Sequence, residues 1–248
     1  MKIADSLPLI SVIMPVYNGE RFLAGALHNI FAQNYHPLEV IVVDDGSTDG
    51  SAGIIAAFGE QIRYFHQPNA GPAVARNTGL ALARGEFIAF LDVDDRWPAG
   101  KLHAQAQYLR QHLALHLVWG YTQTLYLPGA GQGDRTEQPL PPPSLLPLVG
   151  SALFRKELVT HVGAFDPQLR MGEDVDWFMR IREANLPLQV IAEVTLLYRR
   201  HETNMTHGKK LVEMRTLQAI KQSLDRRRRQ NSGIAAALPP LLTEATPS

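Results

Sequence analysis

The sequence contains no cysteine among its 248 residues. That absence excludes a disulfide scaffold, a zinc–thiolate site, an iron–sulfur cluster and a thiol nucleophile. An excess of charge is also missing, because 24 lysines and arginines balance 24 aspartates and glutamates. A nucleic-acid-binding protein needs excess cations facing the phosphates, so the balance argues against nucleic acid as a partner. Any partner must therefore be recognised by a local site.

Long hydrophobic runs are missing as well. No stretch approaches the roughly 18 apolar residues of a membrane-spanning helix, and Asp5 and Pro8 interrupt an N-terminal run that is too short for a secretory signal. We therefore expect a cytoplasmic protein. The four arginines at 226–229 leave peripheral contact with the inner face of the membrane as an alternative, but a solvated basic end of a helix is the favoured interpretation.

The sequence does contain alternating apolar patterns. Hydrophobic residues make up 45% of the chain, enough for a sizeable core. Continuous β-branched runs predict strands at 9–14, 39–43, 62–66, 86–91 and 115–124, and apolar residues at three- and four-residue spacing predict helices at 22–31, 51–58, 73–83 and 101–112. Repeated strand–helix–strand units predict an α/β fold, with a mostly parallel sheet flanked by helices in a single Rossmann-like domain.

The second half of the chain is less regular. Residues 128–143 hold five prolines and three glycines and predict a loop. Beyond it we expect a strand at 152–154, helices at 156–162 and 174–184, a strand at 188–191, and a C-terminal helix that docks through an apolar stripe from Leu211 to Leu224. The expected organisation is an N-terminal extension at 1–8, one domain at 9–231 and a flexible tail at 232–248.

Polar clusters follow three of the predicted strands. They lie at 15–20, 44–49 and 92–95. Because ligands of parallel α/β sheets bind beyond the carboxyl ends of the strands, we expect these clusters to face one site. Asp92, Asp94 and Asp95 would repel one another without a cation, so they predict a divalent metal, Mn²⁺ or Mg²⁺; the alternative is that one caps a helix and the others are solvated.

Other polar positions allow two interpretations. Asp44 and Asp45 belong to an Asp-Asp-Gly-Ser-Thr-Asp string, which fits a turn followed by a helix cap as well as it fits a binding site. Arg76 is expected to project toward the same end of the sheet, where it could meet a diphosphate or a carboxylate. The sequence has neither the glycine-rich dinucleotide fingerprint after its first strand nor the phosphate-binding loop of many nucleotide-hydrolysing enzymes.

Six strings in the chain resemble family 2 glycosyltransferases of the GT-A fold, in order and in spacing, over about residues 9–207. They are PVYNGERFLAGALHNIFAQNY, EVIVVDDGSTDGS, NAGPAVARNTGLALARGEFIAFLDVDD, GAFDP, GEDVDWFMRI and YRRHETNMT. Each string is moderately specific, but six in register make a chance match improbable.

The resemblance implies roles for individual residues. Nucleotide-sugar binding would fall to Pro15, Val16, Tyr17, Glu20, Asp44, Asp45 and Asp92. We add Arg76, from its place on the predicted helix, and Val93, which replaces the usual small residue between the two aspartates, to the expected donor site. The resemblance further implies Asp94 as a metal ligand, with His201 completing the metal or diphosphate site, and Asp174 as the general base. Glu173 and Trp177 are candidates for the acceptor side. From the residues alone, the acids at 173, 174 and 176 could equally be favourable charges at a helix N-terminus.

The resemblance implies a metal-assisted, inverting glycosyltransferase. Such an enzyme would move a sugar from a nucleoside-diphosphate sugar, expected to be a UDP-sugar, to a hydroxyl of a saccharide, a lipid-linked saccharide or another acceptor. Two rivals stay open. One is a nucleotidyltransferase that makes sugar nucleotides, although it would need a glycine-rich, basic loop that residues 15–20 lack. The other is a non-catalytic module that binds a nucleotide sugar.

Overall fold

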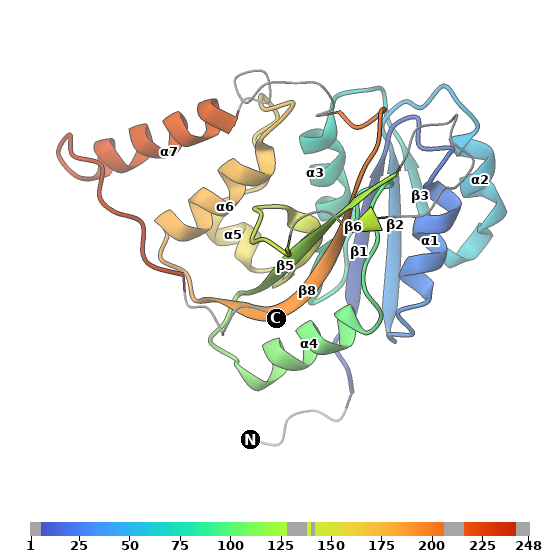
Figure 1. The fold of residues 1–248 in the computed structure, drawn as a ribbon, viewed down its shortest axis with the longest axis horizontal. Coiled ribbons are helices and arrows are strands. Elements are labelled where there is room, and N and C mark those ends of the chain that lie inside the picture. Colours follow the sequence, from blue (N-terminus) through green and yellow to red (C-terminus); the bar gives the residue numbers. More distant parts are fainter. Residues whose placement is uncertain (1–5, 128–137, 140–141, 206–215, 242–248) are drawn as a thin grey trace.

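The computed structural model describes residues 6–127, 138–139, 142–205 and 216–241. Their eight strands form one sheet in the order β3-β2-β1-β4-β7-β5-β6, with β8 also paired to β5 (Figure 1). The expectation of an α/β fold whose sheet is flanked by helices is confirmed.

The first half of the sheet is parallel. β1 (Ile10–Val16) pairs with β2 (Leu38–Asp44) on one side and with β4 (Phe87–Phe90) on the other, and β3 (Arg63–His66) extends the sheet beyond β2. All four strands were predicted from their apolar runs. Parallel pairing places their carboxyl ends, and the polar clusters that follow, at one edge of the sheet.

The second half of the sheet is mixed. β7 (Ala152–Arg155) is antiparallel to both β4 and β5 (Leu117–Tyr126), while β6 (Gln138–Pro139) pairs antiparallel with β5. The strand predicted at 188–191 is much longer, because β8 (Leu188–Arg200) continues parallel to β5 through shifts in register. Polar residues such as Glu193 and Thr195 interrupt its apolar run, which is why the pattern located only its start.

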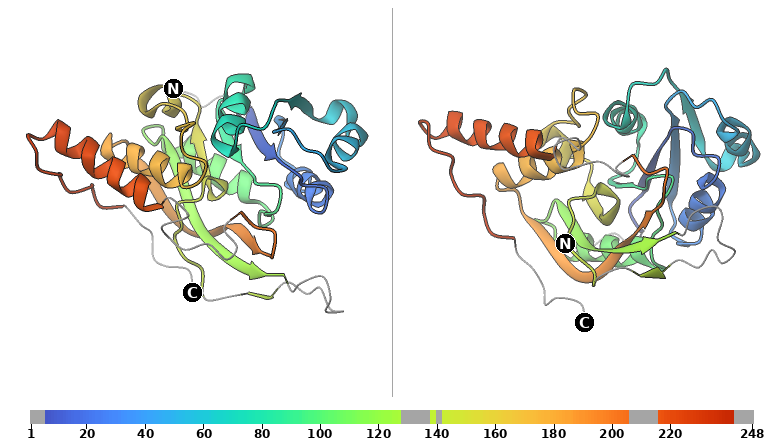
Figure 2. Two further views of the ribbon diagram at one scale, coloured as in Figure 1. Left: turned by 90° about the horizontal axis from the view of Figure 1, so that it is seen from above. Right: turned by 45° about the horizontal axis from the view of Figure 1, so that its top comes forward.

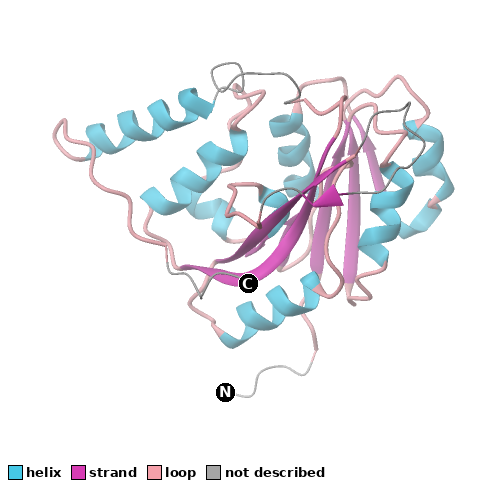
Figure 3. Cartoon of the chain, viewed as in Figure 1, coloured by secondary structure: helices cyan, strands magenta, loops and turns pink. Residues whose placement is uncertain are grey.

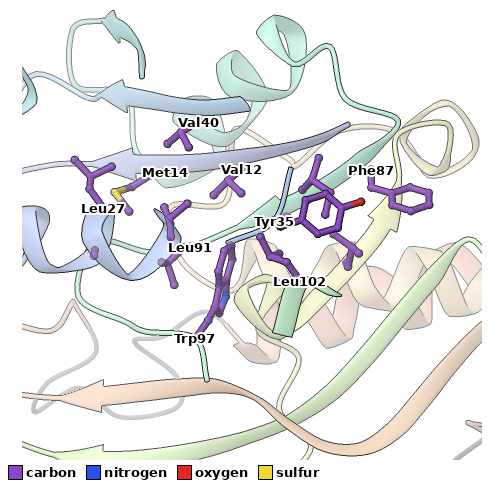
Figure 4. Packing of buried hydrophobic residues seen from close by; sticks show 14 of the residues in the cluster. Val12, Met14, Leu27, Tyr35, Val40, Phe87, Leu91, Trp97 and Leu102 are labelled. Carbon is purple, nitrogen blue, oxygen red and sulfur yellow. The ribbon is translucent and has the colours of Figure 1, made fainter. Parts of the chain in front are cut away.

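Helices cover both faces of the sheet (Figure 3). α1 (Leu23–Phe31), α2 (Ser51–Ala57) and α4 (Lys101–Gln111) contribute to one hydrophobic cluster, part of which is seen in Figure 4. α3 (Pro72–Leu82), α5 (Leu158–Val162) and α6 (Glu173–Glu183) contribute to a second cluster. Two short 3₁₀ turns, η1 (Gly59–Gln61) and η2 (Val149–Ser151), join neighbouring elements.

Gly79 lets α3 approach the sheet closely. A Cβ at this position would lie 2.2 Å from Cγ2 of Ile13 on β1, well inside any tolerable contact. Because α3 also carries Arg76, this close packing fixes the height of the arginine above the sheet.

The C-terminal helix α7 (Thr216–Gln230) lies beside α6 at one side of the molecule (Figures 1 and 2). The expected docking through an apolar stripe is wrong within the described residues, because Leu217 and Ile220 are exposed while Ala219 and Ser223 are buried. The part of the stripe at 211–215 lies outside the described residues.

Residues 232–241 were expected to begin a flexible tail. Instead, Arg182 donates a hydrogen bond to the carbonyl of Pro239, and Leu241 packs against the second cluster. Most of the 128–143 loop, the extension at 1–5 and residues 242–248 lie outside the described residues. No helix in the described part of the chain is long and apolar enough to cross a membrane.

Candidate functional site

Arg76 is the centre of the candidate site. It projects from α3 with 3% of its surface exposed. Its Nη2 donates to both carboxylate oxygens of Asp92, at 2.8 and 3.0 Å, and its Nη1 bonds to Glu173 and lies 3.2 Å from Oδ1 of Asp174. Arg76 was expected to meet a diphosphate or a carboxylate, and in the structure its partners are carboxylates. Burial lowers the pKa of Arg76, but Asp174, Asp92 and Glu173 together raise it, so the guanidinium is charged.

Asp174 opens α6 and is held from two sides. Its Oδ2 accepts a hydrogen bond of 3.0 Å from the backbone N–H of Val149, in η2. Its Oδ1 accepts no hydrogen bond from any described residue, although Arg76 is near. Burial raises the pKa of Asp174 to about 7, with further increases from the charges of Glu173 and Asp92 and opposing effects from Arg76 and the Val149 N–H. A carboxyl group titrating near neutrality can accept a proton at physiological pH.

A second group of side chains surrounds Asp94. Its Oδ2 lies 3.2 Å from Nε2 of His201 and accepts a hydrogen bond of 2.9 Å from Asn204. Nδ1 of His201 lies 2.8 Å from the hydroxyl of Thr203. The structure therefore brings together the two residues expected at a metal site, although they are 107 positions apart in the sequence. The described residues contain no group of three or more acidic, histidine or cysteine side chains arranged to hold a metal.

Asp95 has a structural role. It is 3% exposed, and its Oδ1 accepts a hydrogen bond from the backbone N–H of Arg199, at the end of β8. The Arg199 guanidinium bonds to the carbonyl of Asp94 and lies over the ring of Phe22, 4.8 Å from its centre. These contacts tie the end of β8 to the segment after β4, and so place His201 beside Asp94.

The aspartates after β2 are occupied by contacts within the chain. Asp45 accepts hydrogen bonds from the side chain of Gln67 and from the N–H groups of Ala70 and Gly71. Asp44 accepts from the N–H of Ser47 and from the hydroxyl of Tyr64. Both carboxylates are nearly fully buried. The structure shows the turn contacts expected of this string, and a contact of either aspartate with a ligand would be additional to them.

The segment after β1 presents a different surface. Tyr17 is 54% exposed, whereas Val16 is buried and Pro15 is half-buried. Glu20 accepts a hydrogen bond from the N–H of Gly50, at the start of α2. Val93 packs tightly on Gly19, where an added Cβ would come within 2.8 Å of its Cγ2. This contact joins the segment after β1 to the Asp92–Asp94 segment.

Trp177 is the clearest correction among the expected site residues. Its side chain is fully buried against Phe154 and Phe165, and its indole N–H donates to the carbonyl of Gly163. A tryptophan in the first turns of an amphipathic helix can face either the hydrophobic core or a binding site, and the sequence pattern does not show which. Trp177 therefore supports α6 and is not placed to touch an acceptor.

Sequence reasoning missed three residues near the site. Thr203 and Asn204 contact His201, and Asn204 also contacts Asp94, although no role was assigned to either. Both belong to the YRRHETNMT string, so their closeness to His201 in the sequence was the one sign that they could belong to the site. The aromatic ring of Phe22, 4.6 Å from that of His201, gave no signal because it matched the apolar pattern of α1.

Comparison with known proteins places these features in a family. The family model for glycosyl transferase family 2 matches residues 11–125. An uncharacterized glycosyltransferase of Rickettsia typhi is 30% identical over 215 residues, which cover 81% of this chain and 66% of that protein. TuaG of Bacillus subtilis, named for teichuronic acid biosynthesis, is 36% identical over 119 residues, covering 46% of this chain and 47% of TuaG. The chain thus spans between about half and two thirds of these relatives.

Two solved structures share the fold. TarS 1–349 of Staphylococcus aureus, in complex with UDP-GlcNAc, superposes with a TM-score of 0.69 at 21% identity, covering 88% of this chain and 66% of that one. The mannosyltransferase PcManGT of Pyrobaculum calidifontis, in complex with GDP-Man and Mn²⁺, gives a TM-score of 0.66 at 22% identity, covering 95% and 67%. These two structures show the shared fold. The family-model match at residues 11–125 and the glycosyltransferase of Rickettsia typhi, together with the order of the six sequence strings, show that the chain belongs to glycosyl transferase family 2.

Proposed function

We propose that the chain is a metal-dependent, inverting glycosyltransferase that moves a sugar from a nucleoside-diphosphate sugar, with a UDP-sugar as the expected donor, to an acceptor hydroxyl. The convergence of Asp92, Glu173 and Asp174 on buried Arg76 carries the proposal. One guanidinium links Asp92, expected beside the donor, to Asp174, expected beside the acceptor. Donor and base would thereby be held within a few ångströms of each other.

Asp174 would act as the general base. Its buried Oδ1 accepts no hydrogen bond from the described residues and lies 3.2 Å from Nη1 of Arg76, and this is the oxygen that would take the proton of an acceptor hydroxyl. As that proton moves to Asp174, the hydroxyl oxygen forms a bond to the anomeric carbon, and the bond from this carbon to the diphosphate breaks with its electron pair. The pKa of Asp174, raised by burial to about 7, suits a base that must release the proton again after each turnover.

Asp94 and His201 would hold a divalent cation. Asp94 Oδ2 and His201 Nε2 lie 3.2 Å apart, so one ion can contact both. The hydroxyl of Thr203 can accept a hydrogen bond from Nδ1–H, which leaves Nε2 as the nitrogen that would bind a metal in place of its 3.1 Å contact with the Asn204 amide. Mg²⁺ and Mn²⁺ keep several ligands from water and phosphate, so two protein ligands fit such a site. When bound, the cation would supply positive charge for the leaving diphosphate.

Similarity to other proteins supports the donor class. TarS and PcManGT were solved with UDP-GlcNAc and GDP-Man respectively, so uridine and guanosine diphosphates are the first candidates to test. The name of TuaG points to a growing polysaccharide as one class of acceptor. Saccharides, lipid-linked saccharides and other hydroxyl compounds therefore form the panel of acceptors.

Calorimetry with UDP and GDP tests the donor and metal sites. We expect one nucleotide to bind at least about 10-fold more tightly with Mn²⁺ than with excess chelator, because the cation links the diphosphate to Asp94. Asp94→Ala should lose this difference. Asp225→Ala should keep it, since that carboxylate is exposed on α7. Equal affinity in chelator would overturn the metal assignment, and no binding of either nucleotide would overturn the proposed donor class.

A further inference from the structure

Three consecutive backbone carbonyls in η2 and β7 are held by side chains that come from one short segment. The indole N–H of Trp97 donates to the carbonyl of Gly150 at 2.8 Å, the ammonium of Lys101 to that of Ala152 at 3.1 Å, and the amide of Gln105 to that of Ser151 at 2.9 Å. Since 97, 101 and 105 are four residues apart, they line one side of α4 and the turn before it.

These donors are unusually well buried. Lys101 and Trp97 are 3% and 2% exposed, and Gln105 is fully buried. The Lys101 ammonium lies over the indole ring of Trp97, 4.1 Å from its centre. Burial lowers the pKa of Lys101 well below its ordinary value. Among the described residues, the Lys101 ammonium contacts one carbonyl and one aromatic ring, and burying a charged group with so few partners lowers the stability of the fold. If this position served packing alone, an apolar side chain would stabilise the fold more.

The three carbonyls lie next to the N–H group that contacts the proposed base. Val149 is the first residue of η2, and its N–H donates to Oδ2 of Asp174. Thr195 on β8 adds a further hydrogen bond to the carbonyl of Ser151. The carbonyls of the three residues that follow Val149 are thus hydrogen-bonded by side chains from α4, the turn before it and β8.

We propose that Trp97, Lys101 and Gln105 are positioning residues, which hold the 149–152 backbone so that the Val149 N–H stays aimed at the carboxylate of Asp174. We refer to these three side chains as the α4 clamp. An effect of the clamp on turnover rests on the proposed function of Asp174 as a base. An effect of the clamp on the pKa of the Asp174 carboxylate does not. The groups that face Asp174 from other elements are Arg76 on α3, Asp92 after β4 and Glu173 on α6, and the clamp contacts none of the three.

The clamp can be tested on the free protein by NMR. Trp97→Phe, Lys101→Met and Gln105→Leu each remove one donor with little change in volume. The matched control is Lys156→Met, because Lys156 also donates to a backbone carbonyl, that of Ala83, away from η2. Two quantities are measured: the hydrogen exchange of the Val149 amide, and the titration midpoint of the ¹³C-labelled carboxyl group of Asp174, assigned by its loss in Asp174→Asn.

We expect the clamp variants to speed exchange at Val149 by at least about 10-fold and to raise the Asp174 midpoint by up to about one pH unit, the size expected when a carboxylate loses one hydrogen bond. Exchange of Val12, in the middle of β1, should stay unchanged, and Lys156→Met should match the wild type in both measurements. Faster exchange at Val149 and Val12 alike, or an unchanged midpoint in all three variants, would overturn the clamp. If the NMR shifts occur but Asp174→Asn turns over normally with Mn²⁺ and the nucleotide sugar that binds, the proposed function fails and the clamp stands.

Discussion

Arg76 shows how much one residue contributes to this site. A single buried guanidinium faces three carboxylates, so the cluster holds more negative than positive charge. Such an excess can be relieved when one carboxyl group retains its proton. Asp174 is the group whose pKa burial raises to about 7, and its neighbours Glu173 and Asp92 raise it further. The electrostatics of the cluster thus produce a group that can exchange protons near neutral pH.

Asp174→Asn should reduce turnover by about 10²- to 10⁴-fold while leaving nucleotide affinity within about 2-fold, because a general base acts on the acceptor. In the wild type, turnover should fall as the pH drops below about 7, where Asp174 becomes protonated. Steady-state kinetics across pH, with calorimetry for the nucleotide, measure both effects. Glu173→Gln is the control within the pair. A greater loss of turnover from Glu173→Gln than from Asp174→Asn would reverse their assignment.

The same pKa shift has a consequence for stability. Between the ordinary pKa of an aspartate, 3.8, and about 7, the unfolded state releases the proton that the folded state keeps. The contribution of Asp174 to the free energy of unfolding is therefore complete below pH 4 and declines as the pH rises through 7. Asp174→Asn should flatten this decline in urea titrations. Equal pH dependence in both proteins would mean that Asp174 ionises normally in the fold.

At the scale of helices and strands, the sequence located an element correctly where its pattern of apolar residues was regular from end to end. The runs that form β1, β2 and β4 are continuously apolar because helices cover both faces of the parallel half of the sheet. β8 could be located only at its start, since Glu193, Thr195 and the arginines at 199 and 200 break its apolar run, and its buried positions follow no regular alternation. The contact face of α7 was mistaken because its described part buries the small residues Ala219 and Ser223 and is held to α6 by ion pairs of Arg226.

Arg226 is expected to hold α7 on α6. Its guanidinium bonds to Asp176 and to both oxygens of Glu183, two carboxylates that are nearly buried. Arg226→Met should lower the free energy of unfolding by about 1–3 kcal/mol and speed amide exchange at Ala219 and Ser223, because the nearly buried carboxylate of Glu183 loses its ion pair, while Asp176 keeps the one with Arg180. Urea denaturation and hydrogen exchange measure the two effects.

Arg228→Met provides the matched control for α7. Among the described residues, the Arg228 side chain makes a single ion pair, an exposed one with Asp225 at 3.6 Å, so its removal should change the free energy of unfolding by less than about 0.5 kcal/mol. If the two variants behave alike, the contacts of Arg226 do not anchor the helix.

At the scale of the whole molecule, the site depends on contacts between distant parts of the chain. Arg76 meets Glu173 across 97 positions and Asp94 meets His201 across 107. The resemblance to the family could name Asp94, His201 and Asp174, because motifs keep their order along the chain. It could not show that Arg76 bonds both Asp92 and Glu173 and lies beside Asp174, since that depends on how the parallel and mixed halves of the sheet meet.

This arrangement leads to a prediction about stereochemistry. Asp174 is the base we assign, and the carboxylates nearest to it, Asp92 and Glu173, are both bonded to Arg76. A double displacement would need a free nucleophile on the sugar, whereas a carboxylate neutralised by a guanidinium is a poor one. We therefore expect a single in-line displacement, in which an α-linked nucleotide sugar gives a β-glycoside.

Proton NMR of freshly formed product measures this outcome. With a gluco- or galacto-configured donor, a β-glycoside shows a large coupling between the first two ring protons, and an α-glycoside shows a small one. The product must be observed early, and a reaction mixture with Asp174→Asn provides the background without enzymatic turnover. A small coupling from an α-linked donor would require a covalent or front-face route. In that case the assignment of Asp174 as the base of a single displacement would be wrong, while metal-dependent binding of the nucleotide at Asp94 would be unaffected.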